Sequence, residues 1–409
     1  MMSDNLFIIL VLMTGAVIVL NLLVKSGLRR INLPPLVGYL CIGFGLGCLQ
    51  NVGGVPGTPM DEIFTFLGKA GLVALLFRVG LESDLGALLH QLREASIVWW
   101  VNFSFSGILG YGCAYYLLGL PMIASLVVAT AFTATSVGVS VAVWQDNGAL
   151  SSPDGQLLID VAELDDISAV VLMALLFALL PDLKQGASES GWAPALARQT
   201  AFFLVKLIGF GTLCYLFSRF VERRMTAFFR SLESRPDPML SIVGIGFVIA
   251  ALAAWFGFSL AIGAFFAGLV FSRDPQAVKM ESSFLPVYDL LSPFFFIVIG
   301  LHIDPGVLRV AAGLGVVLAL AAVVSKLASA GLPVFFTRGG RSALLIGASM
   351  VPRAEISMVI MENARALGDW AVTAPVFAAM VCVTLVTCVA GPLVVQSMLT
   401  RGLHQAKVK

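Results

Sequence analysis

Residues 157–180 read LLIDVAELDDISAVVLMALLFALL. As a helix, this stretch is long enough to cross the hydrocarbon core of a bilayer, which takes about 20 apolar residues. Asp165 and Asp166 lie side by side in its middle. An ionised group is costly there unless it has a partner or a function, and each of two neighbouring carboxylates disfavours ionisation of the other. The pair therefore indicates a membrane protein that holds a cation or a proton.

The composition extends this interpretation to the whole chain, because 59% of its 409 residues are hydrophobic and only 12% are charged. A soluble domain carries about 25% charged residues. Apolar runs of about 20 residues recur along the entire length, which predicts an all-α polytopic protein in the lipid bilayer. The six cysteines lie in apolar segments, so disulfides and metal binding are disfavoured and no cofactor is expected. The formal net charge of +1 says nothing about partners, and no nucleic acid is expected among them.

We predict 13 transmembrane helices, at residues 6–25, 34–51, 62–80, 95–118, 121–143, 156–180, 199–219, 238–256, 258–273, 284–301, 307–335, 341–364 and 371–399. The loops between these spans are short, so we expect a single membrane domain, 1–409, without a soluble regulatory domain. Lys and Arg residues gather on one side of the spans. This bias places the C-terminus in the cytoplasm and, with an odd number of spans, the N-terminus outside.

A weak internal repeat relates the two halves of the chain. Gly38-x4-Gly43 in the second span is matched by Gly263-x4-Gly268 in the ninth, at an offset of 225 residues. The motif Gly-Leu-x-x-Asp ends at Asp84 and again at Asp304, at an offset of 220 residues. Because the matched spans are an odd number apart, the two copies would run in opposite directions. Inverted repeats of this kind are common in transporters.

Further charges accompany the aspartate pair. Asp160 and Glu163 lie about one turn apart nearer the cytoplasmic end of the same span. They could line an entry funnel that attracts cations, and a solvated helix end explains them equally well. Successive helix residues point about 100° apart, so one aspartate of the pair can face water while the other faces a neighbouring helix. Lys326, in the middle of the eleventh span, needs a counter-charge, for which Asp165 and Asp166 are the candidates.

The partnership of Lys326 with an aspartate has two interpretations. It could be a static salt bridge that only fixes the fold. It could also take part in transport, because a buried lysine gives up its proton more readily than an exposed one. A cation that binds the aspartates would then remove the partner of Lys326 and release a proton.

Two predicted spans contain residues that interrupt a helix. The twelfth includes Pro352, which breaks the hydrogen-bond ladder beside Arg353 and Glu355. The fifth, its counterpart in the repeat, includes the hydroxyls of Thr135 and Ser136 and has a glycine, Gly138, where the helix could open. Interrupted helices at matching positions point to a transport site. The two hydroxyls and the freed carbonyls would bind a hard cation, and the two charges would offset the helix-end dipoles. The alternative for the hydroxyls is ordinary helix packing through small residues.

Six motifs, taken together and in this order, resemble the second cation:proton antiporter family, a family of bacterial monovalent cation:proton antiporters. This family includes sodium/proton exchangers and Kef-type potassium systems. No single motif is specific for the family, whereas the combination is specific and covers nearly the whole chain. The motifs are residues 33–40 (LPPLVGYL), 76–85 (LFRVGLESDL), 134–139 (ATSVGV), 165–166 (DD), 263–269 (GAFFAGL) and 352–355 (PRAE).

The resemblance implies a homodimer in the bacterial inner membrane that exchanges sodium or lithium for protons by alternating access and serves pH homeostasis. Each subunit would have an interface part, with spans within 1–80 and 238–301. A core part, with spans within 95–180 and 307–399, would hold two crossing discontinuous helices and would move against the interface part.

Residue roles also follow from the resemblance. Asp166 would be the main ligand of the transported cation and proton, with Asp165 beside it paired to Lys326. Further contributions would come from Thr135, Ser136, Glu355 and Arg353.

The chain departs from the family pattern at two places. Ala354 stands where the family usually has glycine in a Pro-Arg-Gly-Glu motif, and Glu163 is unusual. Kef-type systems generally have Gln-Asp at the position of Asp165 and Asp166, together with a regulatory C-terminal domain. These differences from Kef-type systems favour sodium, and K+/H+ exchange of the Kef type is the alternative.

The sequence gives less support to two functions of other classes. An intramembrane aspartyl protease needs two catalytic aspartates on different helices, whereas Asp165 and Asp166 are neighbours on one helix. A passive channel would conduct without regard to the proton gradient. We therefore expect a transporter and no catalytic residues.

Overall fold

The computed structural model describes residues 4–30, 33–53, 58–82, 92–186, 192–222, 224–225, 228, 239–272 and 277–408. These residues form helices joined by short connections, with no strand among them. Helices suit a bilayer because they satisfy their own backbone N–H and C=O groups where water is absent. Within the described ranges, nine helices are long and apolar enough to cross a membrane, and three shorter apolar helices accompany them. The predicted all-α, multi-span architecture is confirmed.

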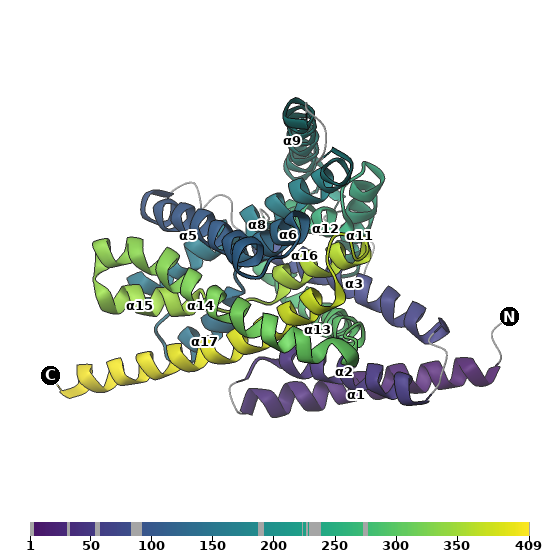
Figure 1. The fold of residues 1–409 in the computed structure, drawn as a ribbon, viewed down its shortest axis with the longest axis horizontal. Coiled ribbons are helices and arrows are strands. Elements are labelled where there is room, and N and C mark those ends of the chain that lie inside the picture. The colour runs from purple at the N-terminus through teal and green to yellow at the C-terminus, as the bar shows by residue number, and fades with distance from the viewer. Residues whose placement is uncertain are drawn as a thin grey trace.

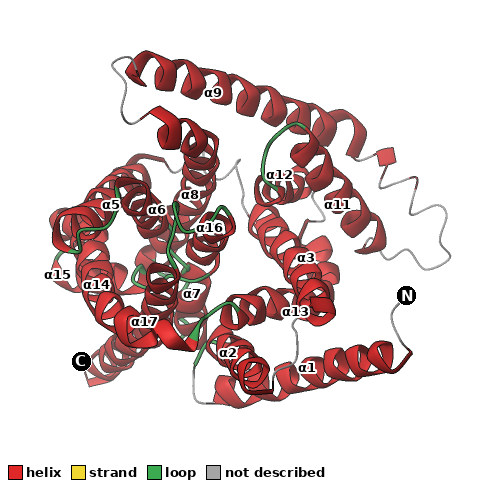
Figure 2. Cartoon of the chain, turned by 45° about the vertical axis from the view of Figure 1, so that its right-hand side comes forward, coloured by secondary structure: helices red, strands yellow, loops and turns green. Residues whose placement is uncertain are grey.

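The helices pack in two groups, with α9 (Trp192–Phe217) between them in contact with both α8 and α12 (Figure 2). The first group consists of α1 (Asp4–Arg30), α2 (Pro35–Gly53), α3 (Thr58–Glu82), α11 (Met239–Trp255), α12 (Leu260–Ser272) and α13 (Ala277–Leu301). The second consists of α5 (Leu92–Gly112), α6 (Met122–Thr133), α7 (Val137–Asp146), α8 (Pro153–Gly186), α14 (Leu308–Arg338), α15 (Gly340–Ser349), α16 (Glu355–Ala366) and α17 (Ala374–Val408). Three short turns extend these helices: η1 (Cys113–Leu117), η2 (Ser218–Glu222) and η3 (Pro305–Val307).

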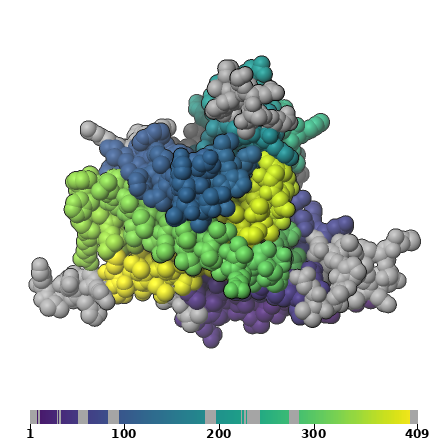
Figure 3. All heavy atoms as spheres, viewed as in Figure 1, coloured from purple at the N-terminus to yellow at the C-terminus, as the bar shows by residue number. Residues whose placement is uncertain are grey.

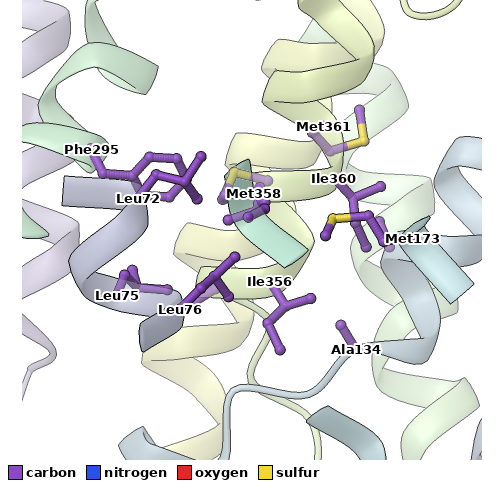
Figure 4. Packing of buried hydrophobic residues seen from close by; sticks show 14 of the residues in the cluster. Leu72, Leu75, Leu76, Ala134, Met173, Phe295, Ile356, Met358, Ile360 and Met361 are labelled. Atoms are coloured by element: carbon purple, nitrogen blue, oxygen red, sulfur yellow. The ribbon is translucent and has the colours of Figure 1, made fainter. Parts of the chain in front are cut away.

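A large apolar cluster joins the two groups. Leu72 and Leu76 of α3 and Phe295 of α13 lie on one side of it, facing Ile356 and Met358 of α16 (Figure 4). All five side chains are buried. At these residues, the contact between the two groups is therefore made by hydrocarbon.

The outward faces of the helices are apolar as well. Large exposed hydrophobic side chains include Leu12 on α1, Ile108 on α5, Phe202 on α9 and Val316 on α14. Figure 3 shows α5 and α14 side by side on one face of the molecule. Apolar faces of this extent are unfavourable in water, and they fit a chain that is surrounded by lipid.

Glycines let the helices of the first group approach closely. A Cβ atom placed on Gly43 of α2 would overlap the carbonyl of Ile297 in α13, and one on Gly268 of α12 would overlap the carbonyl of Phe77 in α3. Small residues at such contacts are typical of membrane helices. Both glycines belong to the proposed repeat. The close approaches give each of them a role in helix packing. Asp84, from the other repeat motif, lies outside the described residues.

The substitution Gly43→Ala is expected to destabilise the protein, because α2 or α13 must shift to admit the methyl group. Overpacking of this kind costs about 1–3 kcal/mol. Gly45→Ala on the same helix is the matched control, since a Cβ atom there meets nothing within 4 Å. Thermal unfolding in detergent, followed by size-exclusion fluorescence, should show a lower Tm for Gly43→Ala alone. Equal Tm values for the two variants would contradict the packing role.

Candidate functional site

Two helices are interrupted, and their breaks touch. Residues 134–136 separate α6 from α7, and residues 350–354 separate α15 from α16. The Ser136 N–H donates to the Pro352 carbonyl at 2.8 Å, which links the two breaks directly. Figure 2 shows these connections in the middle of the second helix group. Pro352 has no N–H to donate and disrupts a helix, so the second break forms where the sequence predicts it.

Arg353 occupies the space between the breaks. Its side chain is fully buried and lies over the Phe132 ring, 4.4 Å from the ring centroid. The guanidinium donates to the carbonyls of Phe132 and Ala134 at the end of α6, and to the Ser325 hydroxyl at 3.1 Å. A cation at the C-terminal end of a helix satisfies carbonyls that lack an intrahelical partner and is favoured by the helix dipole. These α6 carbonyls therefore contact Arg353, which leaves side-chain oxygens as the better cation ligands.

Asp165 is fully buried and accepts three hydrogen bonds through Oδ2. The donors are Asn102 Nδ2 at 2.6 Å, Thr135 Oγ1 at 2.7 Å and Lys326 Nζ at 3.2 Å. The Lys326 ammonium also donates to the Thr133 carbonyl at 3.0 Å, and it is fully buried too. The structure therefore brings Lys326 to Asp165 and not to Asp166, as the resemblance implies.

The second oxygen of this carboxylate has a different environment. Asp165 Oδ1 is buried and accepts no hydrogen bond from any described residue. Buried carboxylate oxygens of this kind are uncommon, because desolvation without a partner is costly. The atom is available to a ligand that the protein itself does not supply.

Asp166 follows Asp165 on α8, where successive positions differ by about 100° in direction, and it is only partly buried. It makes no hydrogen bond or ion pair to the described residues. The acidic groups that act on it electrostatically are those of Asp165, Glu355, Glu82 and Glu163. These four carboxylates favour a cation near Asp166, whereas the Lys326 ammonium, which also interacts with Asp166, opposes it.

Glu355 begins α16 and accepts a hydrogen bond from the Ser136 hydroxyl. This contact joins the two breaks a second time, now through side chains. Ala354, which precedes it, has φ −139° and ψ −94°. That φ lies outside the left-handed region in which glycine is favoured.

Asp160 lies apart from the pair, in a cavity of about 120 Å³ whose lining includes Glu94 and Arg338. Arg338 donates to Glu94 at 2.7 Å and to Asp154 at 3.1 Å, which ties the beginnings of α5 and α8 to the end of α14. Glu163 is partly buried, and its charge acts on Asp166. The two residues predicted to form a funnel therefore have separate surroundings.

Asn102 is a site residue that the sequence analysis missed. It is fully buried in α5 and makes the shortest of the three contacts to Asp165. The available signal was an amide in the middle of an apolar span, with Ser106 one turn further along. A polar side chain at that depth needs a partner, yet the sequence alone does not say which.

The fold and the site together define a class of protein. Many apolar helices surround two broken helices, whose meeting point holds buried charges and a carboxylate pair. This arrangement is typical of a secondary transporter that binds its substrate near the middle of the membrane.

Comparison with known proteins agrees with that class. The family model described as "Sodium/hydrogen exchanger, transmembrane" matches residues 15–401, and the chain therefore belongs to the sodium/hydrogen exchanger family. It is 27% identical to the high-affinity Na+/H+ antiporter NhaS3 of Synechocystis sp., over 81% of this chain and 70% of that protein. It is 25% identical to the Na+/H+-K+ antiporter GerN of Bacillus cereus, over 89% of each chain.

A solved structure supports the fold. The sodium proton antiporter MjNhaP1 from Methanocaldococcus jannaschii superposes with a TM-score of 0.67, covering 96% of this chain and 98% of the other at 16% identity. The predicted resemblance to monovalent cation:proton antiporters is confirmed. The protein is a multi-pass membrane antiporter and not an enzyme.

Proposed function

We propose that the protein exchanges sodium for protons by alternating access at Asp165 and Asp166. The observation that carries the proposal is the unsatisfied, buried Oδ1 of Asp165 next to the partly exposed Asp166. A bound cation would supply the missing partner, and hard cations prefer oxygen ligands. The hydroxyls of Thr135 and Ser136 lie in the adjacent break and could contribute further oxygens.

In the proposed cycle, one cation and protons compete for the same carboxylates. Asp166 is protonated on the side of high proton activity, and the cation displaces that proton on the other side. If the cation also draws Asp165 away from Lys326, the lysine releases a second proton. Two protons would then cross for each sodium ion, so one net charge would move, worth about 2.3 kcal/mol per 100 mV of membrane potential.

We infer that the two helix groups are the moving parts. The second group would be the core part, within 95–180 and 307–399, and the first would be the interface part, within 1–80 and 238–301. The broken helices and the buried charges of the site belong to the second group, and the contact between the groups is apolar at the residues that Figure 4 labels. This apolar part of the surface can slide without breaking hydrogen bonds, and the contact between His302 and Glu362 is a polar exception. The proposed inverted repeat, in a chain of 13 spans, would place the two breaks at matching positions.

The orientation and assembly are also proposals. The start of α1 and the end of α17 lie at opposite ends of the molecule, as an odd number of spans requires (Figure 1). With the basic loops in the cytoplasm, the N-terminus would face outside the bacterial inner membrane. We expect a homodimer, with the lipid bilayer around it.

Proton efflux from proteoliposomes in response to sodium, lithium and potassium tests the proposed substrate. We expect sodium and lithium to drive flux at concentrations at least about tenfold lower than potassium. Potassium as the better substrate would instead favour K+/H+ exchange, a candidate supported by the relative GerN, whose name includes K+. Flux that ignores the proton gradient would contradict exchange altogether.

A contact between the two helix groups predicts a pH effect. His302, at the end of α13, lies 3.0 Å from Glu362 of α16, and this contact becomes an ion pair only when the imidazole is protonated. Its stabilising effect on this arrangement is present at low pH and is lost as the pH rises and the imidazole loses its proton. We expect His302→Gln and Glu362→Gln to flatten the dependence of the transport rate on external pH.

The control for this prediction is Asp369→Asn. Asp369 forms an ion pair with Arg365, and both residues belong to the second group, so removing it should leave the pH profile unchanged. If the pH profiles of the transport rate are the same for His302→Gln and wild type, the contact does not regulate transport.

A further inference from the structure

The chain at the end of α9 presents two different faces. The turn η2 follows α9, and within it the Ser218 hydroxyl donates to the Val270 carbonyl of α12 at 2.6 Å. Ser218 and Glu222 are buried on this side. Arg219 and Phe220, in the same turn, are exposed, and the exposed fraction of Phe220 is 60%. The turn therefore fixes one face to the protein and leaves an arginine and a phenylalanine on the surface.

The same combination of basic and aromatic side chains continues along the sequence. Arg224 is exposed, and Phe228 is exposed to the same extent as Phe220. Residues 218–235 read SRFVERRMTAFFRSLESR, with five arginines against two glutamates, of which Glu222 is buried. The formal net charge of the whole chain is only +1. This segment therefore concentrates positive charge beside exposed phenyl rings.

The two arginines lack an acidic partner among the described residues. The Arg219 guanidinium donates to the Tyr215 hydroxyl at 3.3 Å and lies 5.9 Å from the centroid of the Phe220 ring. Neither Arg219 nor Arg224 forms an ion pair within the described ranges, whereas Arg338 binds two carboxylates there. The charges of both arginines are therefore available to an anion that the protein does not supply.

An anionic phospholipid matches both features of this surface. α9 lies at the outer edge of the molecule (Figure 2), and residues 197–222 are long and apolar enough to span the bilayer. The arginines therefore lie where this span reaches the membrane surface. Guanidinium groups bind phosphate well, and acyl chains beside the phosphate would cover the phenyl rings. A soluble anion would leave those rings uncovered. Basic residues at the cytoplasmic end of a span are typical of sites for anionic lipids.

We propose that the end of α9 binds an anionic phospholipid of the cytoplasmic leaflet. The phosphate would lie at Arg219 and Arg224, and the acyl chains would lie against Phe220 and Phe228. Because α9 contacts α8 of the second helix group and α12 of the first, the lipid would hold the helix between the two groups at the membrane surface. The proposal rests on the surface of α9 and not on the transport site.

The test measures the apparent affinity of the purified protein for phosphatidylglycerol, from the rise in Tm as this lipid is added in detergent. Phosphatidylcholine, which has no net charge, should stabilise wild type only at much higher concentrations. Each arginine near an anionic headgroup contributes about fivefold in affinity, so Arg219→Gln/Arg224→Gln should weaken the binding of phosphatidylglycerol by about 25-fold. Glycerol phosphate, which has the phosphate without acyl chains, should not raise the Tm at these concentrations.

The matched control is Arg30→Gln/Arg341→Gln. Both arginines are exposed, and both lie on the side that the basic residues assign to the cytoplasm. This double variant therefore removes the same charge without changing α9, and it should keep the affinity of wild type for phosphatidylglycerol. An equal loss of affinity in the two double variants would mean that only the general excess of basic residues attracts the lipid, which would overturn the proposal.

Mass spectrometry of the intact protein gives a second readout that does not depend on thermal stability. After transfer from phosphatidylglycerol-containing nanodiscs, wild type and the control variant should retain bound phosphatidylglycerol under conditions in which Arg219→Gln/Arg224→Gln loses it. Equal retention by all three proteins would contradict the site at the end of α9. Stabilisation of wild type by glycerol phosphate as effective as that by phosphatidylglycerol would also overturn the proposal, because the ligand would then be a soluble anion.

Discussion

Asp166→Asn should abolish sodium-coupled proton flux in proteoliposomes. An asparagine has nearly the same size and can still offer one oxygen to a cation, but it cannot bind and release the transported proton. The lost charge should also weaken sodium binding by roughly a hundredfold, since a contact to a charged group contributes up to about 3 kcal/mol. The measurement is the sodium-dependent collapse of an imposed pH gradient, recorded with a pH-sensitive dye.

Asp182→Asn is the control for this variant. Asp182 lies on the same helix, α8, and is exposed, so its substitution should leave exchange at the wild-type rate. Folding of both variants is checked by their elution from a sizing column. Sodium-coupled flux that persists in a folded Asp166→Asn variant would refute the assignment of the site.

Arg353→Met should cause the largest loss of stability. The guanidinium satisfies several carbonyls at the end of α6 and also binds Ser325. Methionine fills similar space but leaves those carbonyls unpaired and buried, and breaking a buried charged network costs about 3–5 kcal/mol. We expect little folded protein, or a strongly lowered Tm in detergent. Arg353→Lys keeps the charge but lacks the forked guanidinium that reaches several acceptors. Its Tm should therefore lie between the values for wild type and Arg353→Met.

Arg365→Met serves as the comparison, because this arginine is partly exposed and its ion pair with Asp369 lies at the surface. Surface ion pairs contribute about 0–1 kcal/mol, so a small change in Tm is expected. An Arg353→Met variant as stable as Arg365→Met would contradict the structural role given to Arg353 at the breaks.

Much of the fold follows from elementary patterns in the sequence. Apolar runs predict helices wherever the chain must shield its backbone from lipid, and Pro352 marks one of the breaks. The pairing of Lys326 with an aspartate was also expected, because a buried ammonium has few possible partners in a span this apolar. These inferences need only local composition and the cost of burying a charge.

The contacts inside the site depended on tertiary structure. Arg353 donates to carbonyls at the end of α6, which lies more than 200 residues earlier in the sequence. No local sequence pattern predicts this contact. The choice of Asp165 as the partner of Asn102 depends on how α5 and α8 are rotated about their axes. From the sequence, Asp160 is either a funnel residue or part of a solvated helix end. The cavity in which it lies, beside Glu94 and Arg338, is formed by three separate helices and so depends on the tertiary fold.

The central claim is that a metal ion and a hydrogen ion share one carboxylate site. It is tested most directly by adding sodium chloride to the purified protein in weakly buffered detergent and recording proton release across a range of pH. The account predicts that sodium releases more protons from wild type than from Asp166→Asn, which can release only the proton of Lys326. It also predicts that the Kd for sodium rises about tenfold for each unit that the pH falls, per displaced proton. Sodium binding with a constant Kd and no released protons would contradict it.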